Sequence, residues 1–328
     1  MMTTIFLSGV SSPWGARVAT ALAEQKDAEV RLLALAHKPP PDEIPGLEFI
    51  RGNPNNPLTV DLLAAENVET VLYLDTLAPK GMSGGANFLA LCAQAGVRRI
   101  ILPSQTQVYG AHPTHPLYIP ETHPLDPKPA PQHRALLDLE SFANGLPVQY
   151  PALTLTVLRF AHILGPSADT PLAHFLLDDR APTLLGFNPL FQLIHEADVL
   201  AALVQTTLHE ISGIYNLAAE DVLPLNKLLG LAGKLPLPLA HPLVAKLPPP
   251  LTPLPLEFLR YPCVAALTRM QNELGYTPAH TAEETVTEFA AEVRRIRYMP
   301  NALDALTNPL RDLVQRLTRA GEEDENNE

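Results

Sequence analysis

The sequence predicts an α/β protein built on a doubly wound parallel sheet, and three observations carry this prediction. Short apolar runs alternate with single helical segments through the first half of the chain. These runs are continuous rather than alternating with polar residues, which is typical of strands covered by helices on both faces. The first run enters a glycine-containing turn that opens a helix, FLSGVSSPWGARVA at residues 6–19. Right-handed crossovers between such units produce a doubly wound sheet.

The expected elements follow in order along the chain. In the first half, apolar runs predict strands at 4–9, 30–36, 47–53, 69–75 and 98–105. The segments between them predict helices at about 15–25, 58–66 and 87–96, the last of which is closed by Gly96. In the second half the alternation is less regular: helices at about 132–145, 197–210 and 281–296, strands at 153–160, 190–195 and 213–218. Thr281 and Glu284 have the spacing of a capping box. A last helix is expected at about 302–319, with a narrow leucine side.

Composition limits the class of protein. Hydrophobic residues make up 46% of the chain and charged residues 18%, which indicates a globular protein. The formal net charge of −12, to which the tail at 322–325 contributes, disfavours nucleic acid as a partner. We expect this tail to be disordered. The apolar runs are too short for a membrane span. The isolated Cys92 and Cys263 suit a reducing cytoplasm and suggest neither a disulfide nor a metal framework.

The 35 prolines concentrate in three segments, 38–45, 112–131 and 235–255. Proline restricts regular helices and central strands, so these segments are expected to be loops. We expect 235–255 to be a lid packed on the body, with a membrane-surface or partner-binding patch as the alternative. His112, His115 and His123 have no spacing typical of a zinc site, so no metal is expected.

Ligands of doubly wound sheets bind at the carboxyl ends of the strands. The predicted strands therefore place five short segments around one crevice: Gly9–Gly15, Ala36–Lys38, Asn53, Asp75–Thr76 and Ser104–Thr106.

The order and spacing of six motifs give the chain a family resemblance. The motifs are Gly9 to Gly15, SQTQVYG at 104–110, LTVLRFAHILGP at 155–166, FQLIHEADV at 191–199, GIYNLA at 213–218 and NELGYTP at 272–278. Through them the chain resembles the extended short-chain dehydrogenase/reductases, specifically the NAD-dependent epimerase/dehydratase family, over about residues 3–290. The likeness is strongest to bacterial proteins labelled nucleotide-sugar epimerases. It implies a Rossmann core at 1–165, a mixed segment at 166–300 that completes the core and forms a small interleaved substrate lobe, and a C-terminal helix with a disordered tail at 301–328.

Active members of this family use a Ser/Thr, a Tyr and a Lys, and all three positions have changed in this chain. The serine position is Gln105. When Asp138 is taken as the family's helix acid, Ala130 replaces the tyrosine and Arg134 the lysine. Arg134 keeps a positive charge but does not exchange protons near neutral pH. Thr106 and His133 are the candidate substitutes, although a solvated or capping role is the stronger expectation for His133. The resemblance makes Tyr109 structural, and gives His195 and Asp198 roles in packing and helix charge.

The resemblance also points to cofactor-binding residues, several of which have changed. Ser12 replaces the middle glycine of the loop, and Pro13 removes an N–H. Ala36 replaces the acid after the second strand, and the following His37 and Lys38 favour NADP over NAD. A carboxylate at Asp75 is unfavourable beside phosphates. The expected set is Gly9, Ser11, Ser12, Trp14, Gly15, His37, Lys38, Asn53, Asp75, Thr76, Ser104 and Arg134.

The expected function is NAD(P) or nucleotide-sugar-like ligand binding by a cytoplasmic protein with a degenerate Ser-Tyr-Lys site. The first alternative is an active epimerase, dehydratase or reductase that uses substitute residues. The second is a scaffold subunit that has lost its ligand. The oligomeric state stays open, with a homodimer among the possibilities.

Overall fold

The computed structural model describes residues 3–25, 28–78, 82–240 and 252–298. Three sequence expectations lie outside these residues: the helix at 302–319, the tail at 322–325 and the central part of the segment 235–255. Among the helices described, none has the length and apolar content needed to cross a lipid bilayer.

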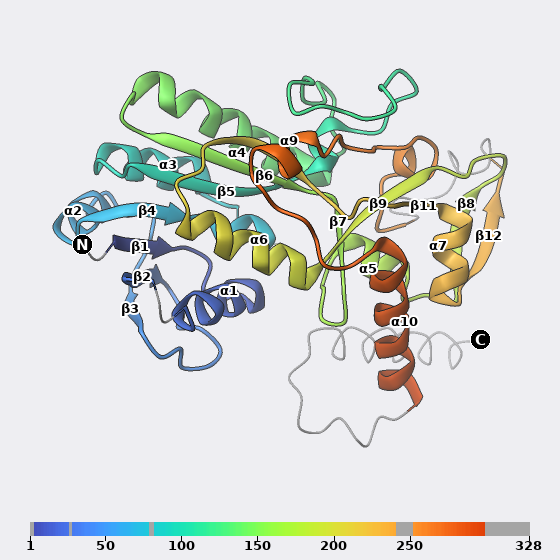
Figure 1. Ribbon diagram of the computed structural model, residues 1–328, viewed down its shortest axis with the longest axis horizontal. Helices are drawn as coiled ribbons and strands as arrows, with labels where there is room; N and C mark the ends of the chain where they lie inside the picture. Colours follow the sequence, from blue (N-terminus) through green and yellow to red (C-terminus); the bar gives the residue numbers. More distant parts are fainter. Residues whose placement is uncertain (1–2, 26–27, 79–81, 241–251, 299–328) are drawn as a thin grey trace, which may run out of the picture.

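The main sheet has seven strands in the order β10-β6-β5-β4-β1-β2-β3, and every neighbouring pair is parallel. This arrangement confirms the predicted doubly wound sheet (Figure 1). The strands are β1 (Thr3–Leu7), β2 (Val30–Ala36), β3 (Leu47–Arg51), β4 (Val68–Leu72), β5 (Arg99–Gln105), β6 (Thr154–Phe160) and β10 (Gly213–Leu217).

Helices cover both faces of the sheet because successive strand residues point to opposite sides. In β1, Ile5 and Leu7 pack towards one cluster of buried residues and Phe6 towards another. The first cluster includes helices α1 (Pro13–Ala23) and α6 (Glu196–Leu208). The second includes α2 (Thr59–Ala65), α3 (Gly85–Gln94) and α4 (Pro131–Gln149).

The strand expected at 69–75 ends earlier than predicted. β4 stops at Leu72, and Leu74–Leu77 form a 3-10 turn, η1. The turn places Asp75 beside the first loop instead of at the end of an extended strand. A second 3-10 turn, η2 (Thr106–Tyr109), follows β5.

A smaller lobe lies at the other end of the molecule (Figure 1). It contains a three-stranded sheet, β11-β9-β7, and a two-stranded sheet, β12-β8. A separate cluster of buried apolar residues joins these strands to helices α5, α7 and α10. The elements are β7 (His162–Leu164), β8 (Arg180–Leu184), β9 (Leu190–His195), β11 (Val222–Pro224), β12 (Leu235–Leu239), α5 (Pro171–Phe175), α7 (Leu225–Ala232), η3 (Leu256–Leu259) and α10 (Ala282–Tyr298). Helix α9 (Thr268–Asn272) packs on the main sheet instead, where Met270 joins the cluster of α1 and α6.

Strand β12 corrects the expectation that all of 235–255 is loop. Its sequence, LPLPL, pairs in parallel with β8. The N–H of Leu235 donates to the carbonyl oxygen of Asp179, so alternate residues face β8. Pro236 and Pro238 alternate with the residues that face β8, so they lie on the unpaired side of this edge strand. A residue on that side donates no hydrogen bond to the sheet, and proline is tolerated there.

The capping box before α10 is confirmed. The Glu284 N–H donates to Thr281 Oγ1 at 3.2 Å, and the Thr281 N–H donates to Glu284 Oε2 at 2.8 Å.

Candidate functional site

The first loop keeps the backbone geometry that requires glycine. Gly9 has a φ of 67°, in the left-handed region that side chains rarely adopt. A Cβ on Gly15 would overlap the carbonyl oxygen of Gly9, because the start of α1 packs directly on the turn. Both glycines are therefore needed for the strand–loop–helix shape. This shape places the amino end of α1 where an anion is favoured.

Ser12 changes what this loop offers to a ligand. It caps α1: its Oγ accepts from the Gly15 N–H at 3.0 Å and donates to the Gly9 carbonyl at 2.8 Å. Pro13 supplies no N–H, and the Ser11 hydroxyl donates to the Lys38 carbonyl. Several donors of the loop are thus already used within the protein. Helix geometry leaves the Trp14 N–H without an intrahelical acceptor, so it stays available to a phosphate.

Asp75 lies beside this loop, and Thr76 follows it in η1. If Gly9 had a Cβ, that atom would be 3.2 Å from Asp75 Oδ1. Burial raises the pKa of Asp75, and a hydrogen bond from Ser8 partly opposes that shift. Thr76 is buried, with its hydroxyl 3.4 Å from the Tyr73 carbonyl oxygen. The loop therefore faces a carboxyl group.

The other predicted cofactor residues on β2 and β3 are at strand ends. His37 and Lys38 follow β2 with exposed side chains. Asn53, also exposed, uses its Oδ1 to accept from the Asn55 N–H at 3.0 Å. All three border the same carboxyl edge of the sheet as Gly9.

Helix α4 carries two acids, Asp138 and Glu140. Glu140 is fully buried, whereas Asp138 is exposed. If Glu140 instead of Asp138 is taken as the family's helix acid, counting back four and eight residues places the lysine position at Leu136 and the tyrosine position at Gln132. Arg134, predicted to hold the cofactor, is exposed on a face of α4 away from Glu140. Ala130 lies before the helix starts.

Glu140 belongs to a buried polar network that fixes β5, β6 and α4 together. Arg159 Nε donates to Glu140 Oε1 at 2.9 Å, and Arg159 Nη1 donates to the Tyr109 hydroxyl at 2.6 Å. The Ser104 hydroxyl also donates to Glu140, so this predicted cofactor residue uses its side chain inside the core. Tyr109 donates in turn to Asn216 Oδ1 at 2.8 Å. Burial raises the pKa of Tyr109 to about 12, consistent with its expected structural role.

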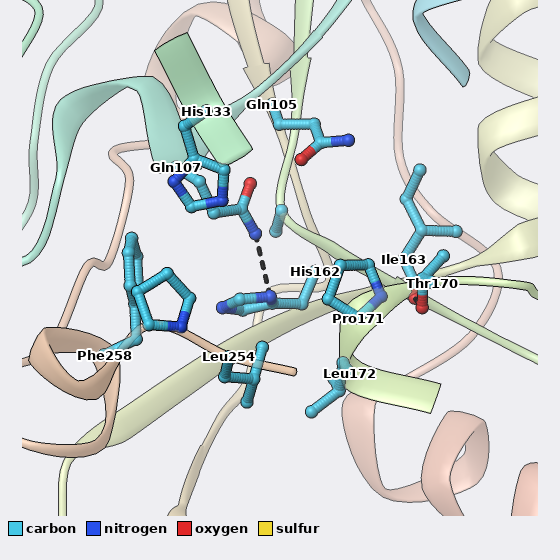
Figure 2. Close-up of a pocket in the computed structure, with 12 residues that line it drawn as sticks. Gln105, Gln107, His133, His162, Ile163, Thr170, Pro171, Leu172, Leu254 and Phe258 are labelled. Atoms are coloured by element: carbon cyan, nitrogen blue, oxygen red, sulfur yellow. Dashed lines mark hydrogen bonds between the residues drawn. The ribbon is translucent and has the colours of Figure 1, made fainter. Parts of the chain in front are cut away.

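A small cavity, with about 30 Å³ of space for the centres of water-sized molecules and one side open to solvent, lies where the carboxyl ends of β5 and β6 meet the smaller lobe. Its polar wall is formed by Gln105, Gln107, His133, His162 and Thr170 (Figure 2). Gln107 Nε2 donates to His162 Nδ1 at 2.8 Å. The Gln107 Oε1 atom is buried and has no hydrogen-bond partner among the described residues. The apolar wall consists of Ala161, Ile163, Pro171, Leu172, Leu254, Pro255 and Phe258.

His133 is not solvated, contrary to the sequence expectation. It is 8% exposed and makes an edge contact with Phe258, with ring centroids 5.7 Å apart. Burial lowers the pKa of His133 to about 4 and the pKa of His162 to about 3. Both imidazoles are therefore neutral near physiological pH. Thr106, the other candidate substitute, is buried beside Cys263, whose Sγ donates to the Thr106 carbonyl.

These neutral histidines predict a loss of stability in acid. The pKa values of these two histidines are lower in the folded state than the usual 6.5 of an unfolded chain, so the unfolded state binds protons more readily. The free energy of unfolding is therefore highest above about pH 6.5 and decreases as the pH falls towards the folded-state pKa values. Between about pH 7 and pH 5, urea unfolding should show a loss of ~2 kcal/mol for each of the two residues. His162→Gln should reduce the loss, while substitution of the exposed His209 by Gln should not. An equal loss in wild type and His162→Gln would contradict the prediction.

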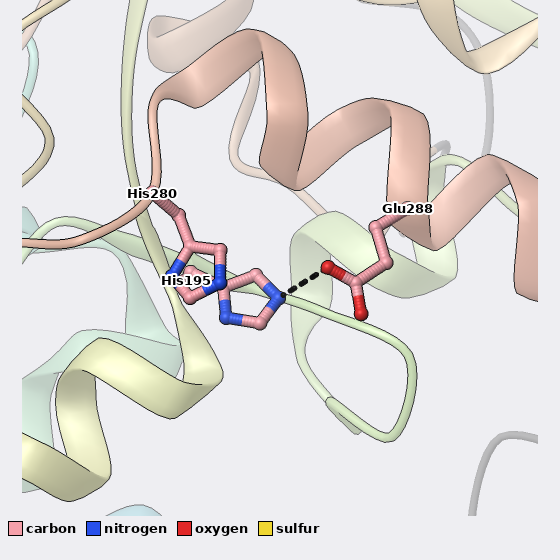
Figure 3. A group of neighbouring side chains, drawn as sticks. All are labelled: His195, His280 and Glu288. Atoms are coloured by element: carbon pink, nitrogen blue, oxygen red, sulfur yellow. Dashed lines mark ion pairs between the residues drawn. The ribbon is translucent and has the colours of Figure 1, made fainter.

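Another group of ionisable side chains joins α6 to α10 (Figure 3). His195 Nε2 lies 3.3 Å from Glu288, and the His280 ring stacks on His195 with centroids 4.0 Å apart. His195 Nδ1 accepts from the Ala197 N–H at 3.1 Å, which caps α6. The ligand atoms of His195, His280 and Glu288 lie within 4.8 Å of one another, and His195 Nε2 is buried without a hydrogen-bond partner among the described residues. Because Nδ1 accepts a hydrogen bond, a neutral His195 carries its proton on Nε2, which must be lost before that atom can bind a metal.

The three histidines of the proline-rich loop lie together, although their spacing gave no sign of this. His115 contacts both His112 and His123, with ring centroids 5.0 Å apart in each pair. His112 Nε2 is 3.3 Å from Asp126 Oδ1. These contacts order the loop next to Tyr109, whose ring meets His123 edge-on.

No protein-family model matches the chain. It is 30% identical over 265 residues to the uncharacterized protein Rv0501 of Mycobacterium tuberculosis, covering 74% of this chain and 70% of that protein, and equally to Mb0513 of Mycobacterium bovis.

Solved structures share the fold. MoeE5 in complex with UDP-glucuronic acid and NAD has a TM-score of 0.67 at 21% identity, covering 89% of this chain and 99% of that one. The dTDP-glucose 4,6-dehydratase of Bacillus anthracis in complex with NAD has a TM-score of 0.68 at 15% identity, covering 90% and 98%. The UDP-glucose 4-epimerase of Thermotoga maritima with UDP-glucose has a TM-score of 0.65 at 16% identity, covering 89% and 99%. The chain thus belongs to the family of the mycobacterial proteins and has the extended short-chain dehydrogenase/reductase fold of the NAD-dependent epimerases and dehydratases.

Proposed function

We propose that this protein is a ligand-binding member of the epimerase/dehydratase fold that does not carry out Ser-Tyr-Lys chemistry. One observation carries the proposal: the 19 residues of α4, PQHRALLDLESFANGLPVQ, contain neither tyrosine nor lysine. The conclusion holds whether the helix is aligned on Asp138 or on Glu140. Without a phenol poised by a neighbouring cation, the proton transfer of the family has no donor on this helix.

The cavity next to α4 supplies the ligand site of this proposal. Gln105, Gln107, His133 and His162 offer neutral donors and acceptors, and the described lining includes no carboxylate, lysine or arginine. Such a wall suits an uncharged, hydroxyl-rich ring such as a sugar. Relatives of this fold that hold UDP-glucose support the same ligand class.

The glycine loop is the proposed site of a dinucleotide. Its backbone fits, since Gly9 and Gly15 keep the close approach of loop and helix. Its donors fit only in part, because Ser12 and Pro13 remove two of them. Fold relatives that contain NAD support the assignment. The exposed Lys38 after β2 favours the 2′-phosphate of NADP.

The test is thermal unfolding with millimolar NADPH or NADH, with UDP-glucose in a parallel series. A ligand at ten times its Kd stabilises the folded state by about 1.4 kcal/mol and raises Tm. We expect this shift for the wild type, larger with NADPH. We expect no shift with either dinucleotide for Gly15→Ala, whose Cβ would displace the loop. Gly145→Ala on α4 is the matched control, since its Cβ would meet no atom within 4 Å. No shift with any ligand would favour a scaffold subunit instead.

The second candidate function is an active NAD(P)-dependent epimerase, dehydratase or reductase. The observation that favours it is the position of His133 on the cavity wall, where a neutral imidazole could accept a proton. A pKa of about 4 matches this task poorly near neutral pH, which puts this function second. Arg134 does not support it, because its side chain is exposed and does not line the cavity.

A further inference from the structure

We propose that Asp75 determines the charge of the ligand that the glycine loop accepts, so that a dinucleotide binds together with a proton. This inference rests on the proposed function, since it concerns the same loop. Asp75 Oδ1 lies 3.2 Å from the position of a Cβ on Gly9, and the Asp75 N–H lies 3.0 Å from it. The carboxyl group is therefore directly against the turn in which a pyrophosphate would be held.

None of the residues that the structure describes neutralises the charge of Asp75, because no ion pair joins it to a lysine, arginine or histidine among them. Its hydrogen-bonding neighbour is Ser8, a buried hydroxyl that also accepts from the Leu74 N–H at 3.0 Å. The ionisable group that faces it from the adjoining chain is Tyr73, whose pKa is raised by burial, so this phenol is neutral. Arg17 of the packed helix α1 is held by Ser167 and Glu196 instead.

An ionised Asp75 and a pyrophosphate would be like charges at close range in a partly buried site. Like charges raise the pKa of a carboxyl by roughly 1–3 units, so the bound state favours the protonated acid. The proton comes from solvent, and the neutral carboxyl then becomes a hydrogen-bond donor. Binding should weaken up to about tenfold for each pH unit above the pKa of the unliganded carboxyl.

Asp75→Asn tests this charge effect, because asparagine keeps the shape and removes the charge. NADH titrations by calorimetry from about pH 5.5 to about pH 8 should show wild-type affinity falling with pH. The affinity of Asp75→Asn should stay nearly constant and exceed wild type by about tenfold or more at the alkaline end. Titrations in two buffers with different ionisation enthalpies should show proton uptake in wild type and none in the variant.

The controls separate this inference from the proposed function. Asp61→Asn, on the exposed side of α2, removes the same charge away from the loop and should behave as wild type. Asp75→Ala is a second neutral variant if Asp75→Asn impairs folding. Binding by wild type with an unchanged pH profile in both Asp75 variants would overturn the role of Asp75 and leave the proposed function standing. Adenosine has no phosphate, so an equal gain in its affinity on substitution of Asp75 would also overturn the role of Asp75. No NADH binding by any variant at any pH would overturn both.

Discussion

Replacing Glu140 by alanine is expected to lower the free energy of unfolding by about 3–5 kcal/mol. The substitution would leave the Arg159 guanidinium buried, with 3% of its side chain exposed, and without its carboxylate. It would also remove the acceptor of the Ser104 hydroxyl. An uncompensated buried charge costs far more than the pair contributed, because the arginine has no water to replace its partner. Urea unfolding of the purified variant measures this loss.

Asp138→Ala is the matched control, since Asp138 lies on the same helix and is exposed. It should change the free energy of unfolding by no more than about 0.5 kcal/mol. A double-mutant cycle of Glu140→Ala with Arg159→Ala should show strong coupling between the two residues. If Glu140→Ala and Asp138→Ala both lower the free energy of unfolding by the same small amount, the buried pair and the alignment built on it are wrong.

The main sheet was predictable from sequence because each of its strands is determined by residues that are adjacent in the chain. Runs such as VRLLALA at 30–36 are apolar apart from Arg31, and a strand covered by helices on both faces is typically a near-continuous apolar run. The capping box at Thr281 and Glu284 was predictable for the same reason. The strand LPLPL was not, because proline is rare in strands unless its missing N–H falls on an unpaired edge. That condition depends on Asp179, more than fifty residues earlier in the chain.

The candidate site was less predictable, because its features depend on distant partners. Asp138 and Glu140 are two residues apart, and the pairing with Arg159 on β6 distinguishes them. His133 is the third residue of helix α4, a place that is usually solvated, but Phe258 covers it from a distant segment. The cavity also uses His162 and Gln107, which the sequence analysis missed. Both were inside quoted motifs, LTVLRFAHILGP and SQTQVYG, so polar residues just after strand ends were the available signal.

The wild-type protein is expected neither to epimerise UDP-glucose nor to oxidise it with NAD or NADP. A positioned acid/base contributes about 10²–10⁴-fold to rate, and here the tyrosine, its lysine and the serine have all changed. These groups act as one unit, so their losses do not multiply. Gln132→Tyr with Leu136→Lys would restore the dyad on the side of α4 that carries Glu140, in the alignment that this acid supports. We expect it to raise turnover above the wild-type background by up to about 10²-fold, limited by Gln105 and Pro13.

The alternative pair, Ala130→Tyr with Arg134→Lys, is the matched control for this rebuilt dyad. It introduces the same two side chains, but Arg134 is exposed and Ala130 precedes the helix, so no turnover should appear. Product analysis by chromatography, with reduced cofactor followed by absorbance, measures both pairs and the wild type. Turnover by the control pair alone would support the alignment on Asp138 instead of the one on Glu140. Robust wild-type turnover that survives His133→Ala and Arg134→Ala but is lost in Thr106→Val would refute the non-catalytic proposal. The acid/base would then lie in η2, ahead of Tyr109, because the Thr106 hydroxyl would be the group whose removal stops proton transfer.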